Sequence, residues 1–106
     1  MIHADPGQPP PLSALNLEEL RTVFDSAQHR RTLVFSIHAK LRSKERSITF
    51  DDVVQICLTG TFKCDPRYEH QNWKYEVAGK DFDEVVTTVV IAVDNDNDWV
   101  TIVTVY

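Results

Sequence analysis

The residues best suited to chemistry lie on a helix that the sequence predicts over about 37–45. His38, Arg42 and Arg46 stand at positions i, i+4 and i+8, so they share one face of that helix. An imidazole exchanges a proton near neutral pH, and guanidinium groups hold a phosphate and stabilise charge as it develops. The trio therefore predicts phosphoryl-transfer chemistry without a metal. The alternative interpretation is a partly buried histidine beside surface arginines, because polar pairs at this spacing are common on helices.

The formal net charge of -5 hides a division along the chain. Residues 21–46 hold seven basic and two acidic side chains and have a net charge of +5, whereas residues 47–106 have a net charge of -7. A basic segment on an acidic chain indicates a local anion site, and the alternative is a solvated basic helix. The negative total argues against tight, indiscriminate binding to nucleic acid.

Length and composition indicate one folded domain. The 106 residues are 42% hydrophobic and 25% charged, close to the globular average. Residues 1–14 hold four of the five prolines and are predicted to be a flexible lead-in, followed by a single domain over 15–106. The longest apolar stretch, 85–93, is much shorter than the ~20 residues of a membrane span, and no secretory signal is recognised at the start. We therefore expect a cytoplasmic protein without membrane contact.

The first two helices are predicted from apolar spacing and caps. Asn16 can cap a helix over about 17–28, which carries apolar residues at helical spacing. Ser36 can cap the helix over 37–45. The residues of this second helix expected to face inward are Ile37, Ala39 and Leu41.

A third helix is predicted over about 50–58. Thr49 and Asp52 have the spacing of a capping box, in which each side chain accepts a hydrogen bond from the other residue's backbone. Gly60 lies just past the end, as expected of a glycine that terminates a helix.

The rest of the sequence alternates like an antiparallel sheet. Four strands are predicted, at about 61–64, 72–78, 84–93 and 99–106, after an early short strand over 32–36. Turns are expected at 79–81 and 94–98, and 65–71 reads as a polar loop. The strand over 84–93 is almost continuously apolar or β-branched, so it should be central and buried on both faces. The predicted fold class is α+β, with N-terminal helices packed on a four-stranded antiparallel sheet.

No metal or cofactor is expected. Cys57, Cys64 and His70 match no common zinc spacing, and two cysteines are too few for a disulfide scaffold, so both are expected to be free thiols. Residues 94–98 begin like a calcium loop, but Trp99 stands where that loop requires glycine. A hairpin turn is therefore predicted there.

Several short motifs, taken in order, resemble the bacterial family known as domain of unknown function 4258. The resemblance covers about residues 15–106. One departure is Ser47 after Arg46, where the family often has glycine; serine adopts positive φ less easily, so the junction after the second helix can differ. The motifs are His38-Ala39 with Arg42 and Arg46, the run Ile48-Thr49-Phe50-Asp51-Asp52-Val53, Gly60, the run Trp73-Lys74-Tyr75-Glu76-Val77-Ala78-Gly79, and the ending Val100-Thr101-Ile102-Val103-Thr104-Val105-Tyr106.

The resemblance implies a place in the superfamily that unites barnase, EndoU, colicin nucleases and RelE-type toxins. Those proteins pack N-terminal helices on a four-stranded antiparallel sheet, and many are metal-independent ribonucleases in toxin–antitoxin pairs or at the tips of delivered toxins. The implied function is an endoribonuclease toxin domain in which the RNA 2′-hydroxyl attacks the adjacent phosphate. The implied partners are an RNA substrate and a cognate antitoxin or immunity protein. The implied place of action is the cytoplasm, either of the producing cell or of a target cell after delivery.

The implied chemistry gives the second helix a central role. His38 would act as the acid or base, and Arg42 would clamp the transition state with support from Arg46. Lys40 on the same helix would bind the substrate.

The implied chemistry also draws on the strands. Lys74 and Tyr75 are strand neighbours that point to opposite faces, so only one of them can line the cleft; Lys74 is the catalytic candidate and Tyr75 a substrate-binding candidate. Thr104 and Tyr106 are two residues apart and can share a face, where they would orient the phosphate or donate a proton.

Two other classes of function remain open at this stage. One is a non-catalytic interaction module of the same fold that binds a protein partner. The other is a DNA-binding regulator, for which a recognition helix with base-reading residues is missing. Toxicity on expression in bacteria, rescued by Arg42→Ala, would separate the enzyme from the interaction module.

Overall fold

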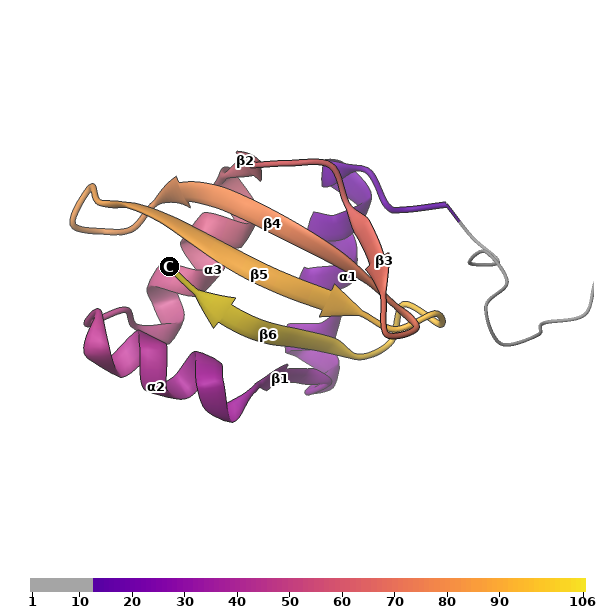
Figure 1. The fold of residues 1–106 in the computed structure, drawn as a ribbon, viewed down its shortest axis with the longest axis horizontal. Coiled ribbons are helices and arrows are strands. Elements are labelled where there is room, and N and C mark those ends of the chain that lie inside the picture. The colour runs from indigo at the N-terminus through magenta and orange to yellow at the C-terminus, as the bar shows by residue number, and fades with distance from the viewer. Residues whose placement is uncertain (1–12) are drawn as a thin grey trace, which may run out of the picture.

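Helices precede most of the strands, as the sequence predicts, and the mixed α+β class is confirmed (Figure 1). A computed structural model describes residues 13–106. Most of the predicted lead-in over 1–14 lies outside these residues. In chain order the elements are α1 (Leu17–Arg30), β1 (Leu33–Phe35), α2 (Ile37–Glu45), α3 (Phe50–Thr59), β2 (Thr61–Phe62), β3 (Arg67–Glu69), β4 (Asn72–Lys80), β5 (Val86–Val93) and β6 (Val100–Val105).

The sheet has more strands than the sequence predicts. Among the described residues it contains six strands in the order β1-β6-β5-β4-β2, with β3 also paired to β4. The early strand β1 joins the sheet by pairing with β6, and this pairing is parallel. The expectation of four antiparallel strands is therefore wrong, while the central place of β5 in the sheet is confirmed.

The strand β3 lies where the sequence predicts a polar loop. It pairs antiparallel with β4 through a two-residue connection, His70-Gln71, in which both residues have positive φ. Hairpin loops of this geometry usually contain Asn and Gly, which tolerate positive φ. Neither residue occurs in this loop, so the sequence carries no hairpin signal here. Packing of Tyr68 against Trp73, with ring centroids 5.4 Å apart, supports the strand pair instead.

The hairpin between β4 and β5 turns later than predicted. β4 continues through Gly79 and Lys80, and Asp81 then accepts hydrogen bonds from the backbone N–H groups of Asp83 and Val85. Gly79 stays in the strand because α3 ends against it: a Cβ on Gly79 would lie 3.1 Å from the Cα of Gly60. The glycine that predicts a turn thus serves the approach of a helix to the sheet.

The hydrophobic core lies between one face of the sheet and the helices α1 and α3 (Figure 1). Gly60 ends α3 as predicted, but its φ of -77 is ordinary, so it is not a left-handed cap. Glycine is required there because a Cβ would lie 2.5 Å from the carbonyl oxygen of Ala78. The buried residues that form the core include Leu20, Phe24, Val53, Ile56, Tyr75, Val77, Val89, Ile91, Val93, Val100, Ile102 and Val105.

The predicted helix caps are confirmed. Asn16 and Glu19 form a capping box on α1, Thr49 and Asp52 form one on α3, and Ser36 caps α2. Asp52 also accepts a hydrogen bond from the backbone N–H of Phe82, which ties the start of α3 to the β4–β5 hairpin.

The end of α2 keeps a left-handed residue although it is not glycine. Ser47 has a φ of 55, its backbone N–H donates to the carbonyl of Lys44, and the N–H of Ile48 donates to the carbonyl of Ser43. These two hydrogen bonds are those of a Schellman ending. The junction therefore has the geometry that a glycine would favour, in spite of the serine.

The helix α2 lies along the edge of β6 and presents a different face from the one predicted. Ala39 is fully buried, but Ile37 and Leu41 are 78% and 58% exposed. The expectation that Ile37 and Leu41 face inward is therefore wrong. α2 packs on the side of the sheet rather than across it, so a narrow strip around Ala39 is enough to make the contact.

Candidate functional site

No helix of the described residues 13–106 covers the face of the sheet opposite α1 and α3 (Figure 1). Cross-strand register places Glu76, Val90 and Thr104 in one row across β4, β5 and β6. These residues alternate with core residues such as Val77 and Val89, so they point to the open face.

A β-bulge in β6 determines which residues at the end of this strand point to the open face. The pairing with β5 shifts between Ile102 and Thr104, so Val103 is the extra residue. Its carbonyl accepts a hydrogen bond of 2.7 Å from the hydroxyl of Ser36, the cap of α2. Because of the bulge, Val105 enters the core, while Thr104 and Tyr106 lie on the open face. The prediction that these two residues share a face fits this placement.

Six polar side chains on the open face form a connected network, called here the open-face cluster. The hydroxyl of Tyr106 donates to Oε1 of Glu76, and Nη1 of Arg67 donates to Oε2 of the same carboxylate at 2.9 Å. Nζ of Lys63 lies 3.1 Å from the Tyr106 hydroxyl and 4.4 Å from the ring centroid. The members of the cluster are Lys63, Arg67, Glu69, Lys74, Glu76 and Tyr106.

Pairing between neighbouring strands brings these side chains together. Tyr106 pairs with Thr88 of β5 through its backbone, so its side chain must cross β5 to reach Glu76 on β4. The N–H of Lys63 donates to the carbonyl of Glu76, and Arg67 is opposite Lys74 in the ladder. The open-face cluster is therefore a product of strand register.

Glu76 is the best-enclosed acid of the cluster, with a side chain only 14% exposed. The hydrogen bond from Tyr106 lowers the pKa of Glu76, and Arg67 adds to the effect against the opposing influence of burial. Glu76 is therefore a carboxylate at neutral pH. Because both of its oxygens are held, its orientation is well defined.

Glu69 connects the remaining bases of the cluster. Its carboxylate lies 3.3 Å from Nε of Arg67 and 3.5 Å from Nζ of Lys74. Burial pushes the pKa of Glu69 upward, but Arg67 and Lys74 together outweigh it, so the net shift is downward. The cluster thus holds three bases and two acids, an excess of one positive charge on a protein with a net charge of -5.

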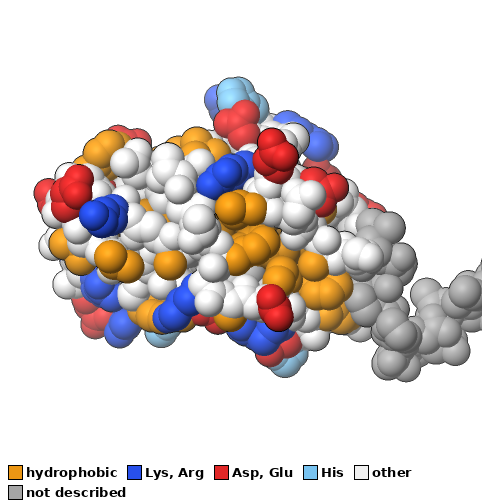
Figure 2. Space-filling view, turned by 90° about the horizontal axis from the view of Figure 1, so that it is seen from above, with side chains coloured by type: hydrophobic (Ala, Val, Ile, Leu, Met, Phe, Trp, Pro, Cys, Tyr) orange, Lys and Arg blue, Asp and Glu red, His pale blue; other side chains and the backbone are white. Residues whose placement is uncertain are grey.

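Viewed from the edge of the sheet that carries β2, positive and negative side chains are interspersed (Figure 2). Figure 2 shows no broad field of a single sign on this side. An anion that approaches here would therefore be held by local contacts rather than by a long-range field.

His38 and Arg42 lie on the flank of α2 that faces the open side of the sheet. Ala39 points at β6, and Lys40 and Ser43 line a pocket against α3, on the covered side. At 100° per residue, His38 and Arg42 fall on the opposite side of Ala39 from Lys40 and Ser43. The predicted shared face is therefore directed toward the open side. The His38 side chain is exposed. Within residues 13–106, neither His38 nor Arg42 bonds to the open-face cluster.

Two other predicted residues lie away from the open face. Lys40 lines the pocket between α2 and α3, on the covered side. Tyr75 is 1% exposed within the core, and its hydroxyl accepts a hydrogen bond from the N–H of Leu15. A substrate-binding role for Tyr75 does not fit this burial. Arg46 is exposed at the end of α2. Nη1 of Arg42 lies 3.8 Å from Oε1 of Glu45 on the same helix.

Sequence reasoning missed four members of the open-face cluster, Lys63, Arg67, Glu69 and Glu76. A signal for Glu76 was present, because Lys74 and Glu76 alternate with Tyr75 and Val77 along one strand. Two charged residues on one face of a central strand indicate that this face is not core. No comparable signal exists for Arg67, because the sequence predicts a polar loop over 65–71, where the structure has β3.

The cysteines and helices add little to the site. Both thiols are free, and burial raises the pKa of the Cys57 thiol strongly, so it stays protonated. Within residues 13–106 no group of three or more His, Cys, Asp or Glu side chains is placed to hold a metal ion. No helix in this part of the chain is long and apolar enough to cross a membrane.

The fold and the site define an α+β domain whose sheet has one helix-covered face and one polar, open face. The chain belongs to the family described as domain of unknown function (DUF4258), whose model matches residues 35–106. This match spans more than half of the chain and contains α2 and the whole open-face cluster. The resemblance seen in the motifs is thus confirmed for the family. No curated protein and no solved structure matches the chain.

Proposed function

We propose that this protein is a metal-independent endoribonuclease toxin domain that cleaves RNA by attack of a ribose 2′-hydroxyl on the adjacent phosphate. The observation that carries the proposal is the bonding of Glu76 to Tyr106 and Arg67 on the open face. An oriented carboxylate, a hydroxyl and cations within one network are the groups that this reaction needs.

The proposed mechanism begins with the Glu76 carboxylate, which accepts the proton of the 2′-hydroxyl. The O2′–P bond forms, and Lys63 and Arg67 stabilise the negative charge that develops on the phosphorane oxygens. The P–O5′ bond then breaks, and the imidazolium of His38 donates a proton to the leaving O5′. The products are a 2′,3′-cyclic phosphate and a free 5′-hydroxyl.

The remaining predicted residues hold the phosphate. Arg42, on the same flank of α2 as His38, clamps the transition state, and Arg46 supports it at the end of the helix. Thr104 lies in the same cross-strand row as Glu76 and orients the phosphate with its hydroxyl. Lys74 bonds to Glu69 and adds positive charge beside Arg67.

The order of elements and the open polar face support a place in the barnase, EndoU, colicin and RelE-type superfamily. In the same proposal the partners are an RNA substrate and a cognate antitoxin or immunity protein. The place of action is the cytoplasm, either of the producing cell or of a target cell.

Cleavage of a mixed-sequence oligoribonucleotide and of total bacterial RNA tests the proposal. We expect cleavage in the presence of EDTA, a 2′,3′-cyclic phosphate product and no cleavage of the matching 2′-O-methyl oligonucleotide. Expression in bacteria should be toxic, and Arg42→Ala should remove the toxicity. Harmless expression with stable RNA would contradict the proposal and favour a non-catalytic interaction module.

A further inference from the structure

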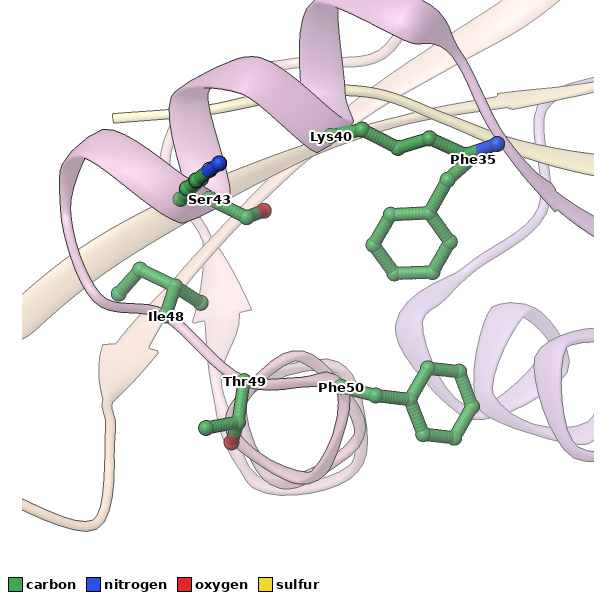
Figure 3. Close-up of a pocket in the computed structure, with 7 residues that line it drawn as sticks. Phe35, Lys40, Ser43, Ile48, Thr49 and Phe50 are labelled. Carbon is green, nitrogen blue, oxygen red and sulfur yellow. The ribbon is translucent and has the colours of Figure 1, made fainter.

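The groove between α2 and α3 is an exposed apolar surface with a positive rim, called here the basic groove (Figure 3). Its volume is about 370 Å³, and its apolar side is formed by Phe35 and Phe50, whose ring centroids lie 5.9 Å apart. Phe50 is 49% exposed, and Leu41 on the outer surface of α2 is 58% exposed. The residues that line the groove are Phe35, Lys40, Ser43, Lys44, Ile48, Thr49 and Phe50.

In the described part of the chain, three polar side chains of the basic groove have no partner, whereas Thr49 is hydrogen-bonded to Asp52. Within residues 13–106, Lys40 and Lys44 take part in no ion pair, and the buried hydroxyl of Ser43 has no hydrogen-bond partner. An apolar pocket with free cations and a free hydroxyl favours a ligand that combines apolar side chains with negative charge.

The tip of the β4–β5 hairpin has the opposite character. Residues 81–86, called here the acidic tip, read Asp-Phe-Asp-Glu-Val-Val. Phe82 and Val86 are 63% and 64% exposed. Among residues 13–106, the ion pair of Glu84 is an exposed one with Lys80, with Nζ and Oε2 3.6 Å apart, and such a pair is worth little in water. Asp83 takes part in no ion pair among the described residues.

The two surfaces lie at the same end of the molecule (Figure 1). The backbone N–H of Phe82 donates to the carboxylate of Asp52 at 3.0 Å, and Asp52 is in the first turn of α3, which begins with Phe50. A twofold axis through this end can therefore bring the acidic tip of each molecule onto the basic groove of the other. Such a pairing buries both apolar areas twice and matches positive with negative charge.

We infer that the basic groove is a docking site for the acidic tip of a second copy of this chain, in a twofold-symmetric dimer. A polyanion such as RNA would match the lysines but would leave the exposed ring of Phe50 without an apolar partner. A second copy covers both features, and both halves of the contact are present in one sequence. This inference is independent of the proposed nuclease activity.

Charge reversal on the full chain, followed by analytical ultracentrifugation, tests the dimer. The wild-type protein should show a monomer–dimer equilibrium between about 1 µM and 1 mM, weakened by salt. Lys44→Glu and Asp83→Lys should each raise the dimer dissociation constant by about tenfold or more, because each change breaks two contacts in a symmetric dimer. Glu18→Lys on α1, away from both surfaces, is the matched control and should leave it unchanged.

The decisive measurement is rescue. An equimolar mixture of the Lys44→Glu and Asp83→Lys proteins should form a heterodimer, and the double variant should regain the homodimer. Circular dichroism and thermal unfolding verify that each variant is folded. A wild-type protein that stays monomeric throughout the range would overturn the inference, as would a dimer indifferent to both substitutions. The inference would also be overturned if Lys44→Glu changed the affinity for an oligoribonucleotide and left the dimer dissociation constant unchanged.

Discussion

The open-face cluster and the basic surface of α2 carry similar side chains in opposite states of pairing. On the sheet, Arg67 and Glu76 are bonded to neighbours on other strands. On α2, Lys40 and Lys44 have no ionic partner within residues 13–106, and Arg42 has only Glu45, 3.8 Å away on the same helix. The sheet therefore holds its groups in fixed geometry, whereas the helix presents lysines without an ionic partner to whatever approaches.

The difference follows from how each element places its side chains. Strand register sets residues that are distant in sequence at hydrogen-bond distance, as with Glu76 and Tyr106. A helix aligns only its own residues, and a partner must come from elsewhere. Precise acid–base work thus suits the sheet, and capture of a charged partner suits the helix.

The sharpest test of this contrast is Glu76→Gln. We expect RNA cleavage to fall about 10³-fold, because the amide cannot accept the proton of the 2′-hydroxyl. The matched control is Glu69→Gln, which touches Arg67 but not Tyr106 and should cost less than about tenfold. Equal losses in both variants, measured as kcat/KM on one oligoribonucleotide, would mean that the cluster acts only through charge.

A second test addresses the helix. His38→Ala should lower RNA cleavage by about 10²-fold or more, the scale expected for a lost general acid–base group. Lys44→Ala, on the other flank of α2, is the control and should retain most of the activity. Full cleavage by a folded His38→Ala variant would remove His38 from the mechanism and leave the chemistry to the sheet alone.

A smaller effect is expected from Tyr106→Phe, which keeps the ring and removes the hydroxyl. Because the Tyr106 hydrogen bond is the main cause of the lowered pKa of Glu76, its loss should raise that pKa. In the proposed mechanism cleavage needs the Glu76 carboxylate, so the acid limb of the pH profile of kcat/KM should move to higher pH. The rate at the plateau should fall about tenfold.

The pH dependence of stability gives a second test of the hydrogen bond between Tyr106 and Glu76. The folded pKa of Glu76 lies below its ordinary value of 4.5, so the group stabilises the fold above that value. This stability is lost as the pH falls through the lowered folded pKa. Tyr106→Phe should reduce this loss of stability. The unfolding temperature of the variant, measured from neutral pH to below 4.5, should therefore fall less steeply with decreasing pH than that of the wild type. An unchanged acid limb and slope would contradict the role of the hydroxyl.

The smallest effect concerns the backbone that ends α2. Ser47 has a positive φ, so Ser47→Gly should relieve strain and stabilise the protein by up to about 1 kcal/mol. Ser26→Gly, inside α1, should instead destabilise by about 0.5–1 kcal/mol. Chemical denaturation measures both changes. A destabilising Ser47→Gly would show that the serine side chain is important at this junction.

Local signals in the sequence predicted the helices well and the strand pairings only in part. The caps Asn16, Ser36 and Thr49 are read from residue type and spacing, because capping involves neighbours three residues apart. The hairpin loop His70-Gln71 was not predictable, because its residues are unusual for positive φ. The orientation of α2 was not predictable either, because it depends on where the edge of β6 lies.

The sequence by itself determined the class of fold, the order of elements, the division of charge and the family motifs. These properties are local, since they depend on periodicity, caps and the composition of segments. Only the tertiary structure decided which charged residues meet. Glu76, Arg67 and Tyr106 are brought together by the register of β3, β4, β5 and β6 and by the bulge at Val103. The exposure of Leu41 results from α2 packing on the edge of the sheet. Long-range pairing is set by the whole core, so no short segment could have encoded it.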